Sequence, residues 1–301
     1  RRQRQMCIRD RINNADMKSY GWEMELSWRD RIEDFNYGVR FTLADGQRKV
    51  LKYPNESGDI YSWYNNKLDG TIWGYTTVGI AQTQEEMNAH LANNKPNWGS
   101  NWGAGDIMYA DLNGDGEVTS GSKTLNDHGD LKVIGNSYAR YNFGFTVDGS
   151  WRGLDFSIFL QGTMKRDYWL DGPYFWGASG DEWQSACFTE HLDYWTPEHT
   201  NAYYPKPYFG NIKKNQEVQS GYLQNAAYLR VKNVQVGYTL PKSWTKKAAM
   251  ESVRFYVSGD NLLTWTGISS IFDPETLGGD WGPGKLYPLQ RTLSVGVNVN
   301  F

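Results

Sequence analysis

The sequence contains no long apolar run and few of the residues that catalysis or cross-linking requires. Its mean hydropathy is −0.68, and no segment approaches the ~18 consecutive apolar residues that suggest a membrane-spanning helix. Two distant cysteines, Cys7 and Cys187, do not predict a disulfide framework. The four histidines fall in predicted loops without a nucleophile motif nearby, so we predict no enzyme. A net charge of −3 gives no reason to expect nucleic acid as a partner.

Aromatic residues and glycine are abundant instead. Fifteen per cent of the 301 residues are aromatic, with 14 Trp and 20 Tyr, and there are 32 Gly. This composition is compatible with a soluble β-rich glycan binder or with a transmembrane β-barrel. A barrel strand exposes only every second residue to lipid, so its mean hydropathy stays modest.

The first residues do not resemble a targeting signal. Residues 1–11 read RRQRQMCIRDR and contain no apolar stretch of the kind that a signal peptide needs. We interpret this segment as non-native and derived from a sequencing adapter. The folded unit is therefore predicted to span residues 12–301.

Apolar and polar residues alternate with a period of two wherever the sequence is regular, which predicts strands with one apolar and one polar face. In one strand Phe143, Phe145 and Val147 alternate with Asn142 and Thr146. Seven segments show this pattern: 22–29, 35–43, 141–148, 154–161, 233–240, 253–258 and 292–301.

Short and long connections alternate between these strands. The turns at 31–34, 151–153 and 241–252 are short, whereas the loops at about 44–138, 166–225 and 261–286 are long. An up-and-down membrane barrel has this arrangement, with short periplasmic turns and long extracellular loops. The pattern predicts an all-β, antiparallel, incomplete barrel whose apolar faces point to lipid. A capping-box pattern after Thr83 predicts one loop helix through about Leu91.

The last strand carries a further signal. Phe301 follows a series of apolar residues that share its face, from Leu293 through Val299. Outer-membrane proteins commonly end on an aromatic residue with this pattern before it. We therefore predict that Phe301 acts as an assembly signal for the barrel-assembly machinery.

Several motifs in order resemble the C-terminal region of the SusC/RagA-type TonB-linked outer-membrane transporters of Bacteroidetes. The resemblance covers about residues 14–301. The segments that carry it are DLNGDG at 111–116, VIGN at 133–136, DYWTP at 193–197, NAYYP at 201–205, YLRVKNVQVGYTLP at 228–241, SGDNL at 258–262, and 287–301.

The resemblance implies that the seven strands belong to a barrel of about 22 strands, plugged by an N-terminal domain. It implies an importer for oligosaccharides or peptides that works with a SusD-type surface lipoprotein, and with the TonB complex through the missing N-terminal region. It also allows a homodimer of the full-length protein. The chain alone is not expected to transport. The alternative is a soluble, secreted, calcium-stabilised β-domain that binds or cleaves glycans.

The loop at 111–117 resembles part of a calcium site. Asp111, Asn113 and Asp115 occupy positions 1, 3 and 5 of a Ca²⁺ loop, with Gly116 at the turn position 6. Glu117 at position 7 would offer its backbone carbonyl. These residue types predict oxygen ligands for one hard cation.

The closing ligand of such a site is not where a plain EF-hand would have it. Position 12 is Ser122, which has no carboxylate. Family members with a shorter loop imply that Asp130 closes the site, and Asp127 is the other candidate. The alternative is a turn cluster without metal, since Asp, Asn and Gly also favour turns.

Aromatic residues in the predicted extracellular loops are candidates for contact with a ligand or a partner protein, because exposed rings of this size call for a reason. The alternative for each is that it packs the loops against one another. The candidates are Trp63, Trp73, Trp98, Trp102, Trp169, Tyr174, Phe175 and Trp176.

Overall fold

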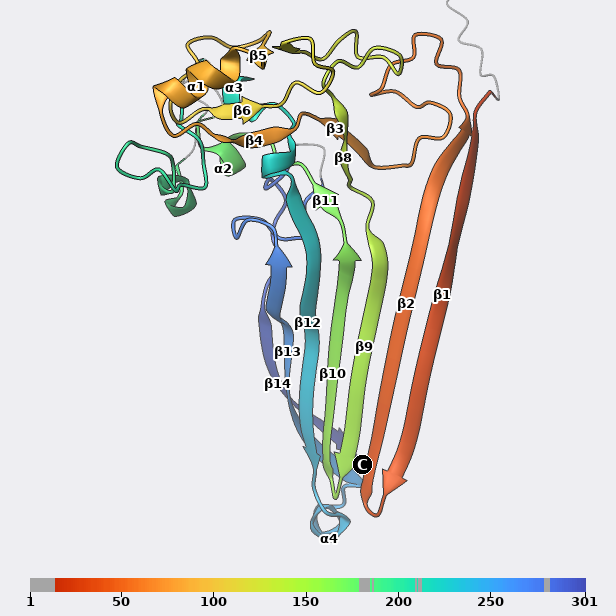
Figure 1. Cartoon of the computed structure of the whole chain (residues 1–301). Helices are drawn as coiled ribbons and strands as arrows, with labels where there is room; N and C mark the ends of the chain where they lie inside the picture. Colours follow the sequence, from red (N-terminus) through yellow and green to blue (C-terminus); the bar gives the residue numbers. More distant parts are fainter. Residues whose placement is uncertain (1–13, 179–184, 186, 209, 211–212, 279–281) are drawn as a thin grey trace, which may run out of the picture.

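One antiparallel sheet runs the length of the molecule. The computed structural model describes residues 14–178, 185, 187–208, 210, 213–278 and 282–301, so the segment 1–11 lies outside the described residues. Neighbouring strands follow one another in chain order, and the first and last lie at opposite edges of an open sheet (Figure 1). The long strands are β1 (Asp16–Ile32), β2 (Phe35–Lys52), β9 (Arg140–Trp151), β10 (Leu154–Lys165), β12 (Gln224–Thr239), β13 (Ser252–Gly267) and β14 (Thr292–Asn300).

All seven predicted strands are present, and most are longer than the alternation suggested. Strand β2 continues through Ala44–Lys52, a segment assigned to a loop from the sequence, because β1 pairs with it along its whole length. Strand β13 likewise continues to Gly267, paired with β12. Pairing to a neighbour thus extends strands beyond the point where the period-two pattern stops.

The register aligns the apolar residues of successive strands. Val147 pairs with Val39 on one side and with Ile158 on the other. A second apolar row crosses the sheet at Phe156, Val236, Val257 and Val295. The opposite face carries a polar row at Asp148, Ser157, Gln235, Ser258 and Ser294. Because side chains alternate between faces, this register gives the sheet one apolar and one mostly polar surface.

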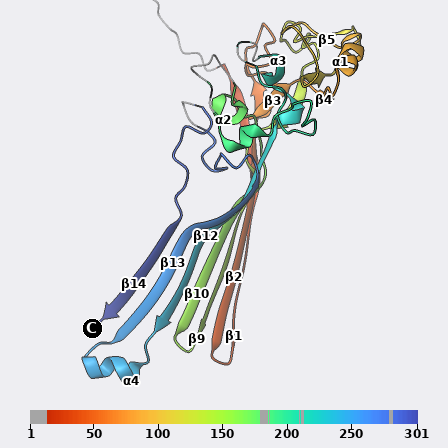
Figure 2. The same ribbon diagram turned by 90° about the vertical axis from the view of Figure 1, so that its left-hand side faces the viewer.

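Short turns lie at one end of the strands and long connections at the other (Figures 1 and 2). The turns between β1 and β2 and between β9 and β10 each have two residues, with Glu33 and Arg152 at positive φ. The third short connection is not a plain turn. It contains α4 (Lys242–Thr245) and the 3-10 helix η3 (Lys246–Ala248).

The long connections fold into small elements of their own. Three two-stranded sheets pair β3 with β8, β4 with β6, and β5 with β7, and β11 adds to the edge of β12. The elements are β3 (Thr71–Gly74), β4 (Thr77–Ile80), α1 (Gln84–Leu91), β5 (Lys95–Pro96), β6 (Ile107–Tyr109), β7 (Glu117–Val118), β8 (Lys132–Asn136), β11 (Asp167–Tyr168), α2 (Pro173–Trp176), η1 (Thr189–Leu192), α3 (Lys213–Gln216) and η2 (Ser220–Tyr222).

Helix α1 confirms the predicted cap. The Thr83 hydroxyl accepts the Glu86 N–H at 3.1 Å. The Glu86 carboxylate turns back to accept the N–H of Gln82 at 2.6 Å, one residue before the cap, rather than that of Thr83 as in a standard capping box. None of the helices in the described ranges is both long enough and apolar enough to cross a membrane.

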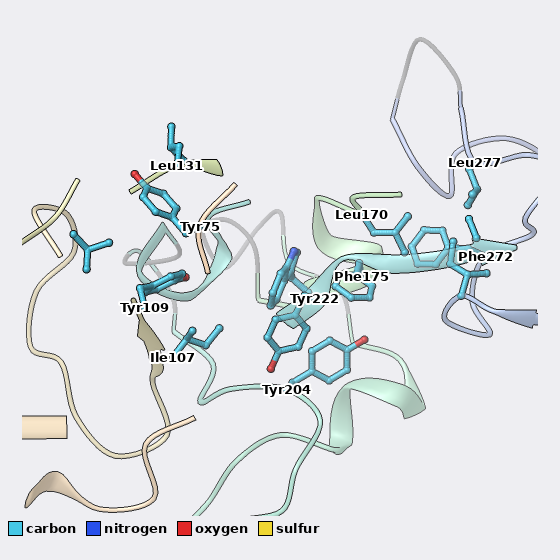
Figure 3. Packing of buried hydrophobic residues seen from close by; sticks show 14 of the residues in the cluster. Tyr75, Ile107, Tyr109, Leu131, Leu170, Phe175, Tyr204, Tyr222, Phe272 and Leu277 are labelled. Carbon is cyan, nitrogen blue, oxygen red and sulfur yellow. The ribbon is translucent and has the colours of Figure 1, made fainter. Parts of the chain in front are cut away.

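The largest buried apolar cluster lies in the loop region, not between the strands (Figure 3). Two buried charges join the first long loop to the second: Lys214 and Asp106 form an ion pair of 2.7 Å, and both side chains are fully buried. The cluster comprises Ile60, Tyr75, Ile107, Tyr109, Val118, Leu131, Leu170, Phe175, Trp176, Tyr204, Tyr222, Ala226, Ile268, Phe272 and Leu277. Because these residues come from all three long connections, the loops pack as one layer at the end of the sheet.

Candidate functional site

The predicted calcium loop lies between β6 and β7 and is held by hydrogen bonds to carboxylates. Asp111 accepts backbone N–H groups from Gly114 at 2.6 Å, Gly116 at 2.8 Å and Asn113 at 3.0 Å. The N–H of Gly116 is the largest of several causes that lower the pKa of the Asp111 carboxyl group. The loop therefore holds Asp111 as a carboxylate.

Asp130 lies against this loop. Its side chain is buried, and it accepts the N–H of Leu112 at 2.6 Å and of Thr119 at 2.7 Å. It also interacts with the side chain of Asp111. Asp127 is turned elsewhere, since its carboxylate accepts the N–H of Ser122 at 2.9 Å.

The remaining predicted ligands are engaged with one another. The Asn113 side-chain amide donates to Asp115 at 2.9 Å, and the Glu117 N–H donates to the same carboxylate at 2.9 Å. In the described part of the chain, no three acidic, histidine or cysteine side chains converge as a ready-made metal site. A bound cation would therefore have to draw Asp115 toward Asp111 and Asp130, so calcium stays a prediction.

The aromatic candidates in the loops belong mainly to the packed layer. Phe175 is fully buried and Trp176 is 7% exposed, so in this structure neither offers a surface to a ligand. Their rings contact Tyr204 and Tyr222, with centroids 4.8–6.5 Å apart. Five others are partly buried against the same cluster: Trp73, Trp98, Trp102, Trp169 and Tyr174. Because they are only partly buried, contact of these five residues with a ligand or a partner protein stays a prediction.

Trp63 differs from the other candidates, because it lies outside this cluster. The ammonium group of Lys67 is 5.9 Å from the centre of its ring. The same ammonium donates to the backbone carbonyls of Ile60, Tyr61 and Ser62. Trp63 is thus held beside a cation in a short loop of the first long connection.

Sequence reasoning missed a small cavity in the loop layer. It has a volume of about 220 Å³, and Tyr61, Tyr75, Trp98, Lys123 and Glu217 are among the residues that line it. Only Trp98 was a candidate beforehand. The lining residues come from segments more than 100 positions apart, so no local pattern could have grouped them.

Phe301 is 90% exposed and follows directly after β14. Its neighbours on the same face, Val297 and Val299, are also exposed. The structure thus keeps the terminal aromatic accessible, and its role as an assembly signal stays a prediction.

Comparison with known proteins identifies TonB-dependent receptors among the relatives of this chain. No protein-family model matches the chain. TonB-dependent receptor P3 of Formosa agariphila is 26% identical over 319 residues, which cover 96% of this chain and 29% of the receptor. TonB-dependent receptor P26 of the same organism is 25% identical. TonB-dependent receptor SusC of Bacteroides thetaiotaomicron is 22% identical over 96% of this chain and 27% of SusC.

The chain is a homologue of the SusC-type TonB-dependent receptors. Solved structures agree at the level of the fold. The RagAB peptide transporter superimposes with a TM-score of 0.67 at 21% identity, covering 96% of this chain and 30% of that one. The RagAB peptide importer in its closed-closed state also gives a TM-score of 0.67. This chain thus spans about 30% of the length of the receptors it matches.

Proposed function

We propose that this chain forms C-terminal strands and extracellular loops of an outer-membrane importer that works with the TonB complex. The observation that carries the proposal is the apolar face of the sheet. Val236, Val257 and Val295 lie side by side on three strands and are 45%, 54% and 83% exposed. In water such a continuous apolar surface is unfavourable, whereas lipid would cover it.

The position of the connections supports the same function. In a barrel that spans the outer membrane, short turns face the periplasm and long loops face the outside. Here the short turns and the loop layer lie at opposite ends of the strands (Figure 2). In this orientation the loop layer would be the first part of the protein to meet an incoming molecule.

The soluble alternative lacks support in the fold. A sandwich buries the apolar face of one sheet against a second sheet. Within the described residues the remaining sheets have two strands each and lie in the loop region. Nothing described covers the middle of this apolar face, around Val236 and Val257, so a soluble glycan-binding domain would expose it to water.

For the substrate we propose an oligosaccharide or a peptide, captured together with a SusD-type surface lipoprotein. The homology to SusC and the structural likeness to the RagAB peptide transporter support this pairing. The small cavity beside Trp98 and Tyr75, about 220 Å³, has the size of a single sugar ring or amino acid side chain rather than of a whole oligomer. Larger ligands would have to span several loops.

Cell fractionation tests the proposal. The receptor-length protein that contains this chain should sediment with the outer membrane and be released only by detergent. Binding of peptide and oligosaccharide pools to the purified protein, with and without a SusD-type lipoprotein, then separates the two substrate classes. Recovery as a folded monomer in detergent-free buffer would reject the membrane assignment.

We also propose that Ca²⁺ binds the loop at 111–117. Asp111, Asn113, Asp115 and Asp130 would supply side-chain oxygens and Glu117 its carbonyl, the donor set that Ca²⁺ prefers. The position of Asp130 supports this, because its buried carboxylate accepts the N–H groups of Leu112 and Thr119 on either side of the loop. The ion's part would be to fix the loop layer, not to take part in transport.

A further inference from the structure

Among the described short connections, the one between β12 and β13 contains helical structure. It is also rich in positive charge. It carries Lys242, Lys246 and Lys247, all exposed, together with Trp244, which is 63% exposed. At the neighbouring turns the charges neutralise each other, since Arg152 pairs with Asp34 at 2.9 Å. We call this connection the lysine turn (residues 241–251); within the part of the chain that the structure describes, its three lysines form no ion pair.

The lysine turn folds back on the sheet. Helix α4 contacts β13, and Thr245 is buried, with its hydroxyl directed at the carbonyls of Lys242 and Glu251. Val253, at the start of β13 on the apolar face, is 5% exposed, whereas Phe255 on the same face is 48% exposed. Because α4 contacts β13, this contrast indicates that the lysine turn covers the apolar face at its end.

We infer that the lysine turn is a docking site for anionic phospholipid at the short-turn end of the strands. This inference rests on the proposed membrane-spanning function. An indole ring is favoured at the boundary between acyl chains and headgroups, and lysines extend their charge into the headgroup layer while their stems stay apolar. Three unpaired ammonium groups beside such a ring match the phosphates of anionic headgroups.

The lysine turn is held in place by hydrogen bonds that do not involve its lysine side chains. Asn300 accepts the N–H of Glu251 at 2.8 Å, which ties the end of the lysine turn to β14. Within the turn, the Thr245 hydroxyl is directed at the carbonyls of Lys242 and Glu251. Because these hydrogen bonds use Thr245 and backbone groups, the three lysines can be exchanged without removing a contact that holds the turn.

Titration of fluorescent phosphatidylglycerol into the detergent-solubilised, receptor-length protein tests the inference. Each lysine near an anionic surface contributes about 1 kcal/mol, so Lys246→Gln should weaken binding about fivefold. The triple variant Lys242→Gln, Lys246→Gln, Lys247→Gln should weaken it about a hundredfold. The corresponding triple arginine variant keeps the charge and should bind like the wild type.

Lys95, Lys123 and Lys132 provide the matched control, because they are exposed at the loop end. Their triple glutamine variant should bind phosphatidylglycerol normally. The inference is overturned if the triple variant of the lysine turn binds like the wild type, if the arginine variant is equally weak, or if the loop-end control loses as much affinity. Failure of the proposed function is seen separately, as loss of the wild type from the membrane fraction.

Discussion

Apolar side chains are exposed along the strands of this molecule but buried in its loops. Along the strands, Val236 and Val257 stand exposed in a row that no described element covers. In the loops, Phe175 and Tyr109 are fully buried. The comparison shows that the loops, not the strands, contain the part of the protein that is organised like a water-soluble core. The strands instead require an apolar environment on one side.

The loop core can be broken by removing one ring. Phe175→Ala leaves a cavity among Trp176, Tyr204 and Tyr222 and should cost ~3–5 kcal/mol. We expect faster hydrogen exchange throughout the loop layer and little change in β9 and β10, measured by mass spectrometry. Leu192→Ala, at an exposed loop residue, is the control. Equal exchange in the two variants would show that the loops do not form one cooperative core.

A single charge on the apolar face of the strands should destabilise the sheet. Val236→Lys places an ammonium group in the apolar row between Phe156 and Val257, which should cost ~2–4 kcal/mol near the middle of a bilayer. Gln235→Lys, on the opposite face, should cost much less. Unfolding by urea in lipid vesicles measures both. If the two variants are equally stable, the apolar face is not in contact with lipid.

Bound Ca²⁺ is expected to stabilise the loops and not the strands, and so to increase the difference in stability between the two regions. At a concentration 100 times its dissociation constant, a bound ion adds about 2.7 kcal/mol. We expect Ca²⁺ to raise the loop-unfolding temperature of the wild type and of Asp127→Asn, but not of Asp130→Asn. Chelator-treated protein is the baseline. If Ca²⁺ does not raise the loop-unfolding temperature of the wild type, the turn cluster without metal is favoured; if Asp130→Asn responds like the wild type, Asp130 is not a ligand.

High pH should act on the loop core before it acts on the strands. Burial raises the pKa of Tyr75, Tyr204 and Tyr222, and that of Tyr109 well above its usual value. Each contributes stability that is fully present below pH ~10, the ordinary pKa of tyrosine, and that is lost as pH rises toward the raised value. Ultraviolet titration should show these groups ionising only as the loops unfold. Free ionisation near pH ~10 would mean that the loop core is open to water.

The strands could be predicted from the sequence because their signal is local. Alternation over a few residues located all seven, and a four-residue pattern after Thr83 located helix α1. The loop layer could not be predicted in the same way. Asp106 and Lys214 are 108 positions apart, and no pattern near Phe175 indicates that it would be buried while Trp63 stays outside the cluster.

The calcium loop could be predicted from the sequence only in part. The spacing of Asp111, Asn113 and Asp115 is readable in the sequence, but the choice between Asp127 and Asp130 needed a family alignment. The structure places Asp130 beside Asp111 and directs Asp127 to Ser122. It does not bring Asp115 into the same cluster, because the N–H of Glu117 and the amide of Asn113 occupy that carboxylate.

Spin labels along β12 test most directly the claim that one face of the sheet meets lipid. With Cys7 and Cys187 replaced by serine, single cysteines at Asn233, Val234, Gln235 and Val236 would carry the label in lipid-reconstituted protein. We predict high accessibility to oxygen at positions 234 and 236, and to a water-soluble nickel complex at 233 and 235. Equal access of the nickel complex to all four positions, or the opposite alternation, would contradict the account.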